Sequence, residues 1–470
     1  MFKKVQKYLL INHPLLWNTK VVPAVSIALL LHILFFFIGY FDGTVNFASE
    51  NQYDDGIGSG IVIFFSILVT ILFFVMWLVY YARNNAYKSF YRLTSAALYK
   101  EWLIIFLICL LNITYSLTYV TGKTLKIRSY YSKEEIEKRC ETISMASVFI
   151  VGSYDHQGPE GDTLSTILYK RQRYSQNSLI NKSMEYFQIN SGKHLESRVK
   201  TWMQDDNRQA IKKMMADYFA IVKEHHLETN LTAEKWLELT YNYPSFIKYE
   251  EVGRTSKKYL GTDENDYVVE AVSNSYKYNL PQNALFANYQ KFSKSWDQPL
   301  IEDDTALVLL YLSLSFAMLL FAFKVTDRRN WLIALVSLGV LWILTGIFAA
   351  IFDSTYVFFG FWMLAIMAII AHFLVVVNKN RSKELSGISL NLMLWSFGAF
   401  LPIFYELITK LFDYPKTVRV GDNLKYVNTP MHDWLEANDS VFAGINVGII
   451  IFAMYLIAIY IKRWKGIAEN

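Results

Sequence analysis

Three short motifs in this chain have residue types that could do chemistry, and each lacks part of the required spacing. Gly122-Lys123-Thr124 has the ending of a phosphate-binding loop, but the glycine needed five positions earlier is Leu117. The pair His225-His226 is followed by Glu228, whereas a zinc-binding helix places two histidines four residues apart. The turn 155–162 carries carboxylates without the alternating spacing of a calcium loop. We therefore expect no catalytic, cofactor-binding or metal-ligating residues, and no enzymatic activity in the chain itself.

Polar residues inside apolar runs are further candidates, because an ionisable group is expensive in hydrocarbon. His32 lies near the middle of the first apolar run. That cost makes it a functional candidate, and a neutral histidine that hydrogen-bonds between helices is the alternative. Asn112 in the third run is typical of a residue that links neighbouring helices.

The seventh apolar run contains a candidate hinge. Gly398, Pro402 and Glu406 are spaced by four residues and share one helix face. Proline leaves a backbone carbonyl without its donor and commonly kinks a helix. Glu406 also precedes Lys410 by four residues, so a plain ion pair at the membrane interface is the alternative interpretation.

The fifth apolar run carries a face of small residues. Gly339, Gly346 and Ala350 are seven and four residues apart and share this face. Small residues allow helix backbones to approach closely where lipid offers no hydrophobic drive. We expect this face to pack closely against a neighbour.

Composition identifies the elements that must position these residues. The chain has 470 residues, of which 53% are apolar and 19% charged, against about 45–50% and about 25% in ordinary soluble domains. The apolar residues gather in runs too long for a soluble core, which excludes disorder, fibres and a water-soluble enzyme. Cys109 and Cys140 lie in an apolar and a polar stretch, so we expect no disulfide. The sequence predicts a polytopic membrane protein.

A transmembrane helix needs roughly 20 predominantly apolar residues, and eight segments meet that test. The segment 121–304 after the third span is predicted to be a mostly helical α+β domain, with apolar residues at helical spacing between 208 and 226. The fold class is therefore mainly α, in three parts: 1–120, 121–304 and 305–470. The predicted spans lie near 22–40, 60–82, 102–120, 306–324, 331–352, 355–377, 388–411 and 442–461.

The distribution of Lys and Arg predicts the orientation of the spans, because cytoplasmic loops are enriched in both. Every second short segment along the chain, counted from 1–20, is rich in Lys and Arg, and together these segments hold 17 Lys and Arg residues. The short loops between them hold 3. We expect both termini in the cytoplasm and 121–304 outside, which in a bacterium means an inner-membrane protein with a periplasmic domain. The net charge of +5 belongs to this asymmetry and does not indicate a nucleic-acid partner.

Two cytoplasmic segments have the composition of interaction surfaces. Phe2, Val5 and Leu9 form an apolar face opposed by lysines, typical of an amphipathic helix in the membrane interface. The loop after the second span mixes basic and aromatic residues, which suits the docking of a cytoplasmic ATPase. A loop that only holds the topology by its charge is the alternative. The candidate docking residues are Arg83, Tyr87, Lys88, Phe90, Tyr91 and Arg92.

The order of Phe2 to Trp17, the first span and the basic stretch Arg83 to Lys100 resembles the membrane subunits of ABC-2-type bacterial exporters. Those subunits begin with an interfacial helix, and a short helix between their second and third spans docks on a separate ATPase. The resemblance implies a permease-like subunit of an ATP-driven envelope exporter, with ATP on the partner subunit and no cofactor in this chain. It covers about the first 120 residues. The family usually has six spans, whereas eight and a long insertion are predicted here.

Two other functions also fit the sequence. A non-catalytic scaffold or sensor would bind a periplasmic protein or lipoprotein through 121–304. A membrane enzyme would act on lipid or glycan. The lipid bilayer is a partner in each case, and a homodimer is compatible with all three.

Overall fold

The chain forms two compact units in the computed structural model. Unit 1 comprises Met1–Leu34, Ile63–Leu117 and Ile301–Asn470, and unit 2 comprises Phe35–Val62 and Thr118–Leu300. Unit 2 thus includes the ends of the first two spans together with the predicted insertion. The residues that the structure describes are 2–48, 59–84, 94–147, 149–150, 166–169, 172–175, 195, 198, 201–202, 205–242, 252–253, 260–262, 268–270, 277–352, 355–379, 383–413, 416–420 and 423–465.

Eight helical segments among the described residues are long and apolar enough to cross a membrane, which confirms a mainly α, multi-pass protein. Many of their large apolar side chains are exposed, for example Leu30, Phe64 and Ile343. Such extensive apolar surface fits contact with lipid chains. The spans are α3 (Val21–Asp42), α4 (Ser59–Asn84), α5 (Ser95–Ile113), α12 (Asp303–Val325), α13 (Arg328–Phe352), α14 (Thr355–Asn378), α15 (Lys383–Ser396) with α16 (Phe400–Leu411), and α18 (Asp439–Lys465).

The third span differs from its predicted position. The helix α5 begins at Ser95, where the Thr94 hydroxyl caps it, and not near residue 102. The charge of Glu101 argues against a span that includes it, but the structure buries this side chain beside a lysine of another helix. At the other end α5 stops at Ile113, and a separate helix, α6 (Tyr115–Arg128), follows.

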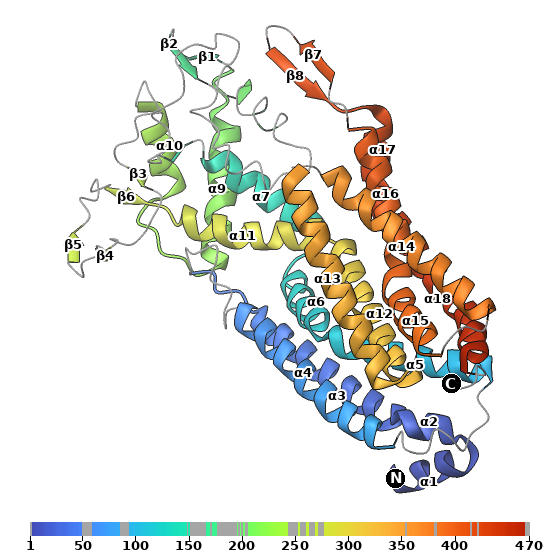
Figure 1. Cartoon of the computed structure of the whole chain (residues 1–470). Coiled ribbons are helices and arrows are strands. Elements are labelled where there is room, and N and C mark those ends of the chain that lie inside the picture. The colour runs from blue at the N-terminus through green and yellow to red at the C-terminus, as the bar shows by residue number, and fades with distance from the viewer. Residues whose placement is uncertain are drawn as a thin grey trace. The chain divides into compact units, whose positions relative to one another are not determined.

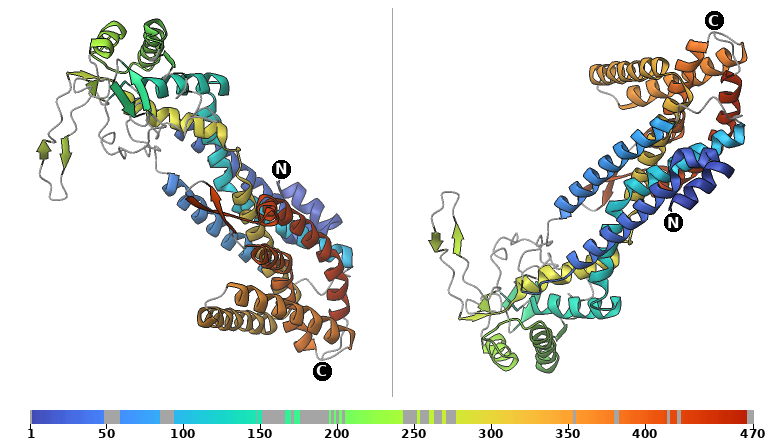
Figure 2. Two further views of the ribbon diagram at one scale, coloured as in Figure 1. Left: turned by 90° about the horizontal axis from the view of Figure 1, so that it is seen from above. Right: turned by 90° about the horizontal axis from the view of Figure 1, so that it is seen from below.

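Unit 1 is organised around α5. Trp102, Ile105 and Cys109 on this helix are fully buried, and they join side chains of α12 and α18 in one apolar cluster. The hairpin of α13 and α14 packs beside α15 (Figures 1 and 2). The N-terminal residues form two short helices, α1 (Phe2–Asn12) and α2 (Pro14–Thr19), and α2 contacts α5.

Unit 2 has a helical core among its described residues. The predicted apolar stripe of 208–226 is confirmed, since Ile211, Met215 and Tyr218 are fully buried. They pack with Trp236 and Tyr289 from two neighbouring helices. Cys140 of this unit and Cys109 of unit 1 are free thiols, as expected. The helices are α7 (Lys133–Ser147), α9 (Arg208–Glu224), α10 (Ala233–Asn242) and α11 (Gln282–Asp297).

The described strands are two to five residues long and pair only two by two. In unit 2, β1 and β2 pair antiparallel, as do β4 and β5, whereas β3 and β6 are parallel. In unit 1, β7 and β8 form an antiparallel hairpin. The α+β character of the insertion therefore stays a prediction beyond its helical core. The strands are β1 (Thr166–Tyr169), β2 (Gln172–Ser175), β3 (Val252–Gly253), β4 (Leu260–Thr262), β5 (Val268–Glu270), β6 (Tyr278–Asn279), β7 (Lys416–Val420) and β8 (Asn423–Val427).

Glycines allow α3 and α6 to cross closely within unit 2. A Cβ atom added at Gly39 would overlap a backbone carbonyl of α6, and one added at Gly122 would overlap the carbonyl oxygen of Phe36 on α3. Gly43, four residues after Gly39, contacts α6 in the same way. This is the small-xxx-small spacing that brings transmembrane helices together.

The predicted small-residue face of α13 behaves differently. A Cβ atom at Gly339 or Gly346 would meet no described atom within 4 Å. The close packing expected at Gly339, Gly346 and Ala350 is therefore not made by those two glycines within the described part of the chain. The glycines that do carry a helix crossing lie on α3 and α6.

A pair of alanine substitutions tests this difference. Gly to Ala normally stabilises a helix by about 1 kcal/mol, but Gly122→Ala forces a methyl group into the α3 backbone. We expect Gly122→Ala to destabilise the protein by about 1–3 kcal/mol, while the matched Gly346→Ala is neutral or stabilising. Thermal unfolding of the purified protein in detergent measures both. A gain of stability in Gly122→Ala would contradict the close crossing.

Candidate functional site

The spans of unit 1 enclose a buried pair of opposite charges. Lys324 of α12 and Glu101 of α5 form an ion pair, with side chains 8% and 1% exposed. The Tyr81 hydroxyl of α4 donates a hydrogen bond to Oε1 of the Glu101 carboxylate at 3.2 Å. The Lys324 ammonium also lies over the Tyr81 ring, 5.1 Å from its centroid. Three spans therefore each contribute one side chain to this site, which we call the charge site.

Burial makes the charge site costly unless both charges are matched. Each ion loses hydration worth on the order of several kcal/mol, which only the partner charge and hydrogen bonds can offset. Oε2 of Glu101 is buried and has no hydrogen-bond partner among the described residues. Trp77 stacks on Tyr81 with ring centroids 5.1 Å apart, and Trp102 is fully buried. Ionisable groups buried among membrane spans are candidates for a functional site.

Uncharged polar groups extend the charge site to two further helices. Thr326 follows Lys324 by two residues and donates to Oδ1 of Asn391 on α15 at 3.1 Å. Nδ2 of Asn391 donates to the Gly387 carbonyl at 3.0 Å. Gly387 leaves room for Asn330 of α13, because an added Cβ atom would lie 2.7 Å from the Asn330 Nδ2. Buried polar groups thus follow Lys324 in the chain and join the end of α12 to α15.

Hydropathy alone does not predict the charge site. Glu101 and Lys324 lie at the edges of apolar runs, where charged residues usually reach the membrane surface. One signal is present in the sequence, since Glu101 is the only acidic residue between positions 56 and 133. The pairing itself joins residues on either side of the whole insertion, and local patterns do not reveal it.

His32 and Asn112 both form hydrogen bonds between helices. Nε2 of His32 donates to the carbonyl oxygen of Leu111 on α5 at 2.8 Å, so this histidine forms a hydrogen bond between helices. Asn112 is fully buried, and its Oδ1 accepts from the Tyr115 hydroxyl at 2.5 Å. Its backbone carbonyl accepts from the Thr70 hydroxyl of α4 at 2.7 Å. Asn112 therefore links α4, α5 and α6.

The seventh span is interrupted at the predicted glycine. A 3₁₀ turn, Phe397–Ala399, separates α15 from α16. Pro402 has no N–H to pair with the carbonyl of Gly398, four residues earlier. Nδ2 of Asn446 on α18 donates to that carbonyl at 3.0 Å and to the Tyr311 hydroxyl at 2.8 Å. The break is thus stabilised by a neighbouring helix, while hinge motion there stays a prediction.

The remaining predicted residues are a surface ion pair and the docking loop. Nζ of Lys410 lies 3.3 Å from Oε1 of Glu406, and both side chains are partly exposed. The pair fits the interfacial alternative. Arg83 lies in the last turn of α4. The other candidate docking residues lie outside the described residues: Tyr87, Lys88, Phe90, Tyr91 and Arg92.

Unit 2 contains a polar network around Arg139 of α7. Its guanidinium pairs with Glu224 of α9 at 2.9 Å and donates to the Tyr289 hydroxyl of α11 at 3.0 Å. The Tyr289 hydroxyl and Nε2 of His225 are hydrogen-bonded at 2.8 Å. Tyr131 donates to the second oxygen of Glu224 at 2.8 Å. This network links the three helices at the edge of the unit's core.

The environment of His225 favours its neutral form. The pKa of His225 is lowered to about 4, chiefly by burial; the nearby charges of Arg139 and His226 contribute to this lowering, and the charge of Glu224 opposes it. The Phe47 ring stacks on the imidazole with centroids 3.8 Å apart. His225 is thus hydrogen-bonded to Tyr289 within the network, whereas the adjacent His226 is exposed.

The other screened motifs have structural roles or lie outside the described residues. Gly122-Lys123-Thr124 lies within α6, and Lys123 pairs with the buried carboxylate of Asp42 at 3.1 Å. A pocket of about 190 Å³ beside this pair is also lined by Lys291 and Lys294, below the roughly 300 Å³ of ordinary ligand sites. The carboxylate-bearing turn 155–162 is outside the described residues.

Comparison with known proteins gives this chain no relative. No protein-family model matches it, and no curated protein or solved structure matches it either. Any function must therefore be argued from its side chains and their contacts.

The charge site predicts a specific pattern of mutant stabilities. Glu101→Gln or Lys324→Met leaves one buried charge unmatched and should cost about 3–5 kcal/mol. The double variant removes both charges and should recover much of that loss. Glu406→Gln, which breaks the exposed pair, should cost about 1 kcal/mol or less. Thermal unfolding in detergent checks all four, and strict additivity of the two buried changes would contradict the pairing.

His225 predicts a pH dependence of stability. Its pKa is about 4 in the folded protein and 6.5 ordinarily, so between these values the unfolded chain binds more protons. Stability therefore falls as the pH decreases from about 6.5 towards about 4. We expect the unfolding midpoint to drop by roughly 2–6 °C more in the wild type than in His225→Gln between pH 7 and pH 5. Equal pH dependence in the two proteins would exclude this role.

Proposed function

We propose that this chain is the permease-like membrane subunit of an ATP-driven bacterial envelope exporter, energised by a separate cytoplasmic ATPase. The charge site carries the proposal. Tyr81 and Glu101 lie on α4 and α5, the two helices joined by the candidate docking loop. A force applied to that loop acts first on these two helices. Lys324 then connects them to α12.

The transmission step is a change in the buried contacts. When the ATPase moves the loop, α4 and α5 shift and the hydrogen bond from Tyr81 to Glu101 breaks or tightens. Because an unmatched buried charge is costly, Lys324 follows the carboxylate and α12 moves with it. Thr326 and Asn391 pass the movement to α15. The span that α15 begins contains the break at Gly398, where the helix can bend.

The proposed orientation places the charge site near the cytoplasmic side of the bacterial inner membrane. The asymmetry of 17 against 3 Lys and Arg in the short loops supports it. Eight crossings put both termini on one side, here the cytoplasm, with 121–304 in the periplasm. In unit 1, α1 begins and α18 ends at the same end of the helices as the start of α5 (Figure 1).

A second candidate function is a scaffold whose periplasmic part binds an envelope protein or lipoprotein. An open groove of about 910 Å³ on unit 2 favours it. The groove lies beside α9 and α10, and its lining mixes the apolar Phe219 and Leu231 with the charged Lys223 and Glu234. Such a mixture is common in protein interfaces.

Affinity purification of the full-length protein tests the proposed function. We expect an ATPase to accompany the wild type and to be lost from the double variant Tyr87→Ala/Phe90→Ala, since losing an aromatic interface anchor costs roughly 2 kcal/mol or more. ATPase activity in the eluate and mass spectrometry provide the measurement.

The matched control changes two exposed aromatic residues of the segment between α16 and α18, which is proposed to lie on the other side of the membrane. Phe412→Ala/Trp434→Ala should retain the ATPase, since these side chains are 39% and 51% exposed. Absence of any ATPase from the wild-type eluate would rule out the exporter. An envelope protein recovered in its place would support the scaffold.

A further inference from the structure

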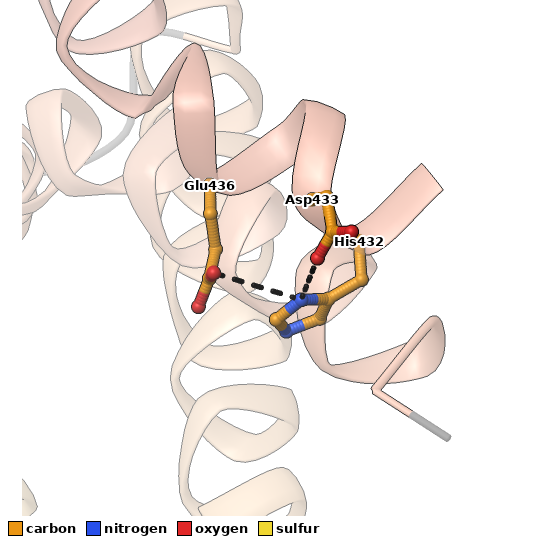
Figure 3. Close-up of side chains that lie close together, drawn as sticks. All are labelled: His432, Asp433 and Glu436. Atoms are coloured by element: carbon orange, nitrogen blue, oxygen red, sulfur yellow. Dashed lines mark ion pairs between the residues drawn. The ribbon is translucent and has the colours of Figure 1, made fainter. Parts of the chain in front are cut away.

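The helix α17 (Pro430–Ala437) presents three possible metal ligands on one face. Thr429 caps the helix by accepting a hydrogen bond from the His432 backbone N–H. His432 and Glu436 are four residues apart, so their side chains lie one above the other on the helix. Asp433 reaches the same space from the adjacent position, as Figure 3 shows.

The ligand atoms of these three side chains converge. Nδ1 of His432 lies 3.8 Å from Oε2 of Glu436 and 4.0 Å from Oδ1 of Asp433. All three atoms lie within 4.8 Å of one another. Ligands of a tetrahedral zinc ion, with metal distances near 2.0–2.2 Å, are separated by about 3.4 Å. A small rotation of the two carboxylate side chains closes that difference.

The state of His432 is a second, independent observation. Its side chain is only 9% exposed, and its buried Nδ1 has no hydrogen-bond partner in the described structure. A buried polar atom without a partner costs about 1–3 kcal/mol. That atom faces the two carboxylates, which are themselves about 60% exposed and open to solvent ions (Figure 3).

The surroundings hold this helix in place. The Tyr405 hydroxyl of α16 donates to the Leu435 carbonyl at 2.5 Å. The Thr429 hydroxyl donates to the carbonyl of Phe412, just after α16, at 2.8 Å. Leu435 is buried. The positions of the His432 and Glu436 backbones are therefore fixed before any ion binds, which lowers the cost of assembling a site.

We propose that His432, Asp433 and Glu436 bind one divalent transition-metal ion, of which Zn²⁺ is the best fit. One imidazole nitrogen and two carboxylate oxygens are typical protein ligands of zinc, with water in the fourth position. Calcium and magnesium prefer sites made of oxygen alone, so the histidine selects against them. The site is separate from the charge site and does not depend on the proposed export function.

Zinc titration of the full-length protein in detergent tests this site. After chelator treatment and dialysis, Zn²⁺ is added in competition with a chromophoric chelator, and Co²⁺ replaces it for the absorption spectrum. We expect one ion per chain and a rise in the unfolding midpoint on zinc addition.

Two ligand variants and one control make the test specific. His432→Ala and Glu436→Gln should each weaken zinc binding more than roughly tenfold, since even changes behind the ligands weaken metal sites by about 10–100-fold. Glu436 is exposed, so Glu436→Gln leaves the fold intact. His226→Ala, from the adjacent-histidine motif of unit 2, should bind zinc as the wild type does. No saturable zinc binding by the wild type, or wild-type binding by both ligand variants, would overturn the proposal.

Discussion

The buried pair of Glu101 and Lys324 sets the register of the spans in unit 1. Both side chains are almost fully buried, so each charge must stay opposite the other. A helix rises by about 1.5 Å per residue, and a slip of one turn between α5 and α12 would separate the pair. The apolar contacts around them tolerate small sliding much better, because dispersion is not directional. The charges therefore select one register, and the packed aromatic side chains of Trp77 and Trp102 then fill the space around it.

The same rule explains the irregular parts of the spans. Nonhelical backbone within a membrane is tolerated only where protein satisfies its polar groups. The Gly398 carbonyl, left without a donor by Pro402, receives one from Asn446. His32 donates to the Leu111 carbonyl near the end of α5, and His372 is hydrogen-bonded to Ser389 at 2.8 Å. Each of these three polar groups, in Gly398, His32 and His372, is therefore hydrogen-bonded to a neighbouring helix.

Hydropathy predicts the eight spans because twenty apolar residues have few other stable environments. Hydropathy fails where a contact between segments that are distant in the sequence determines the position of a helix. The charge of Glu101 makes a span that begins before it look unfavourable, because its pairing with Lys324 is not visible in the sequence. No local sequence pattern predicts that pairing. The spacing of four residues between Gly39 and Gly43 is visible in the sequence. By sequence alone, however, Gly339 and Gly346 look equally suited to a close helix crossing. Conversely, the break near Gly398 was predictable, since proline removes a donor wherever it occurs.

The position of Glu101 in the chain also limits the order in which unit 1 can be made. Glu101 is synthesised before the whole insertion 121–304, and Lys324 is synthesised only after it. Until then Glu101 cannot pair with Lys324, so burying its carboxylate would leave a charge unmatched. The buried pair can therefore form only after α12 has been made. The Gly398 carbonyl likewise waits for Asn446 in the last span. Helices of unit 1 that are made early are thus completed only by contacts with helices that are made later.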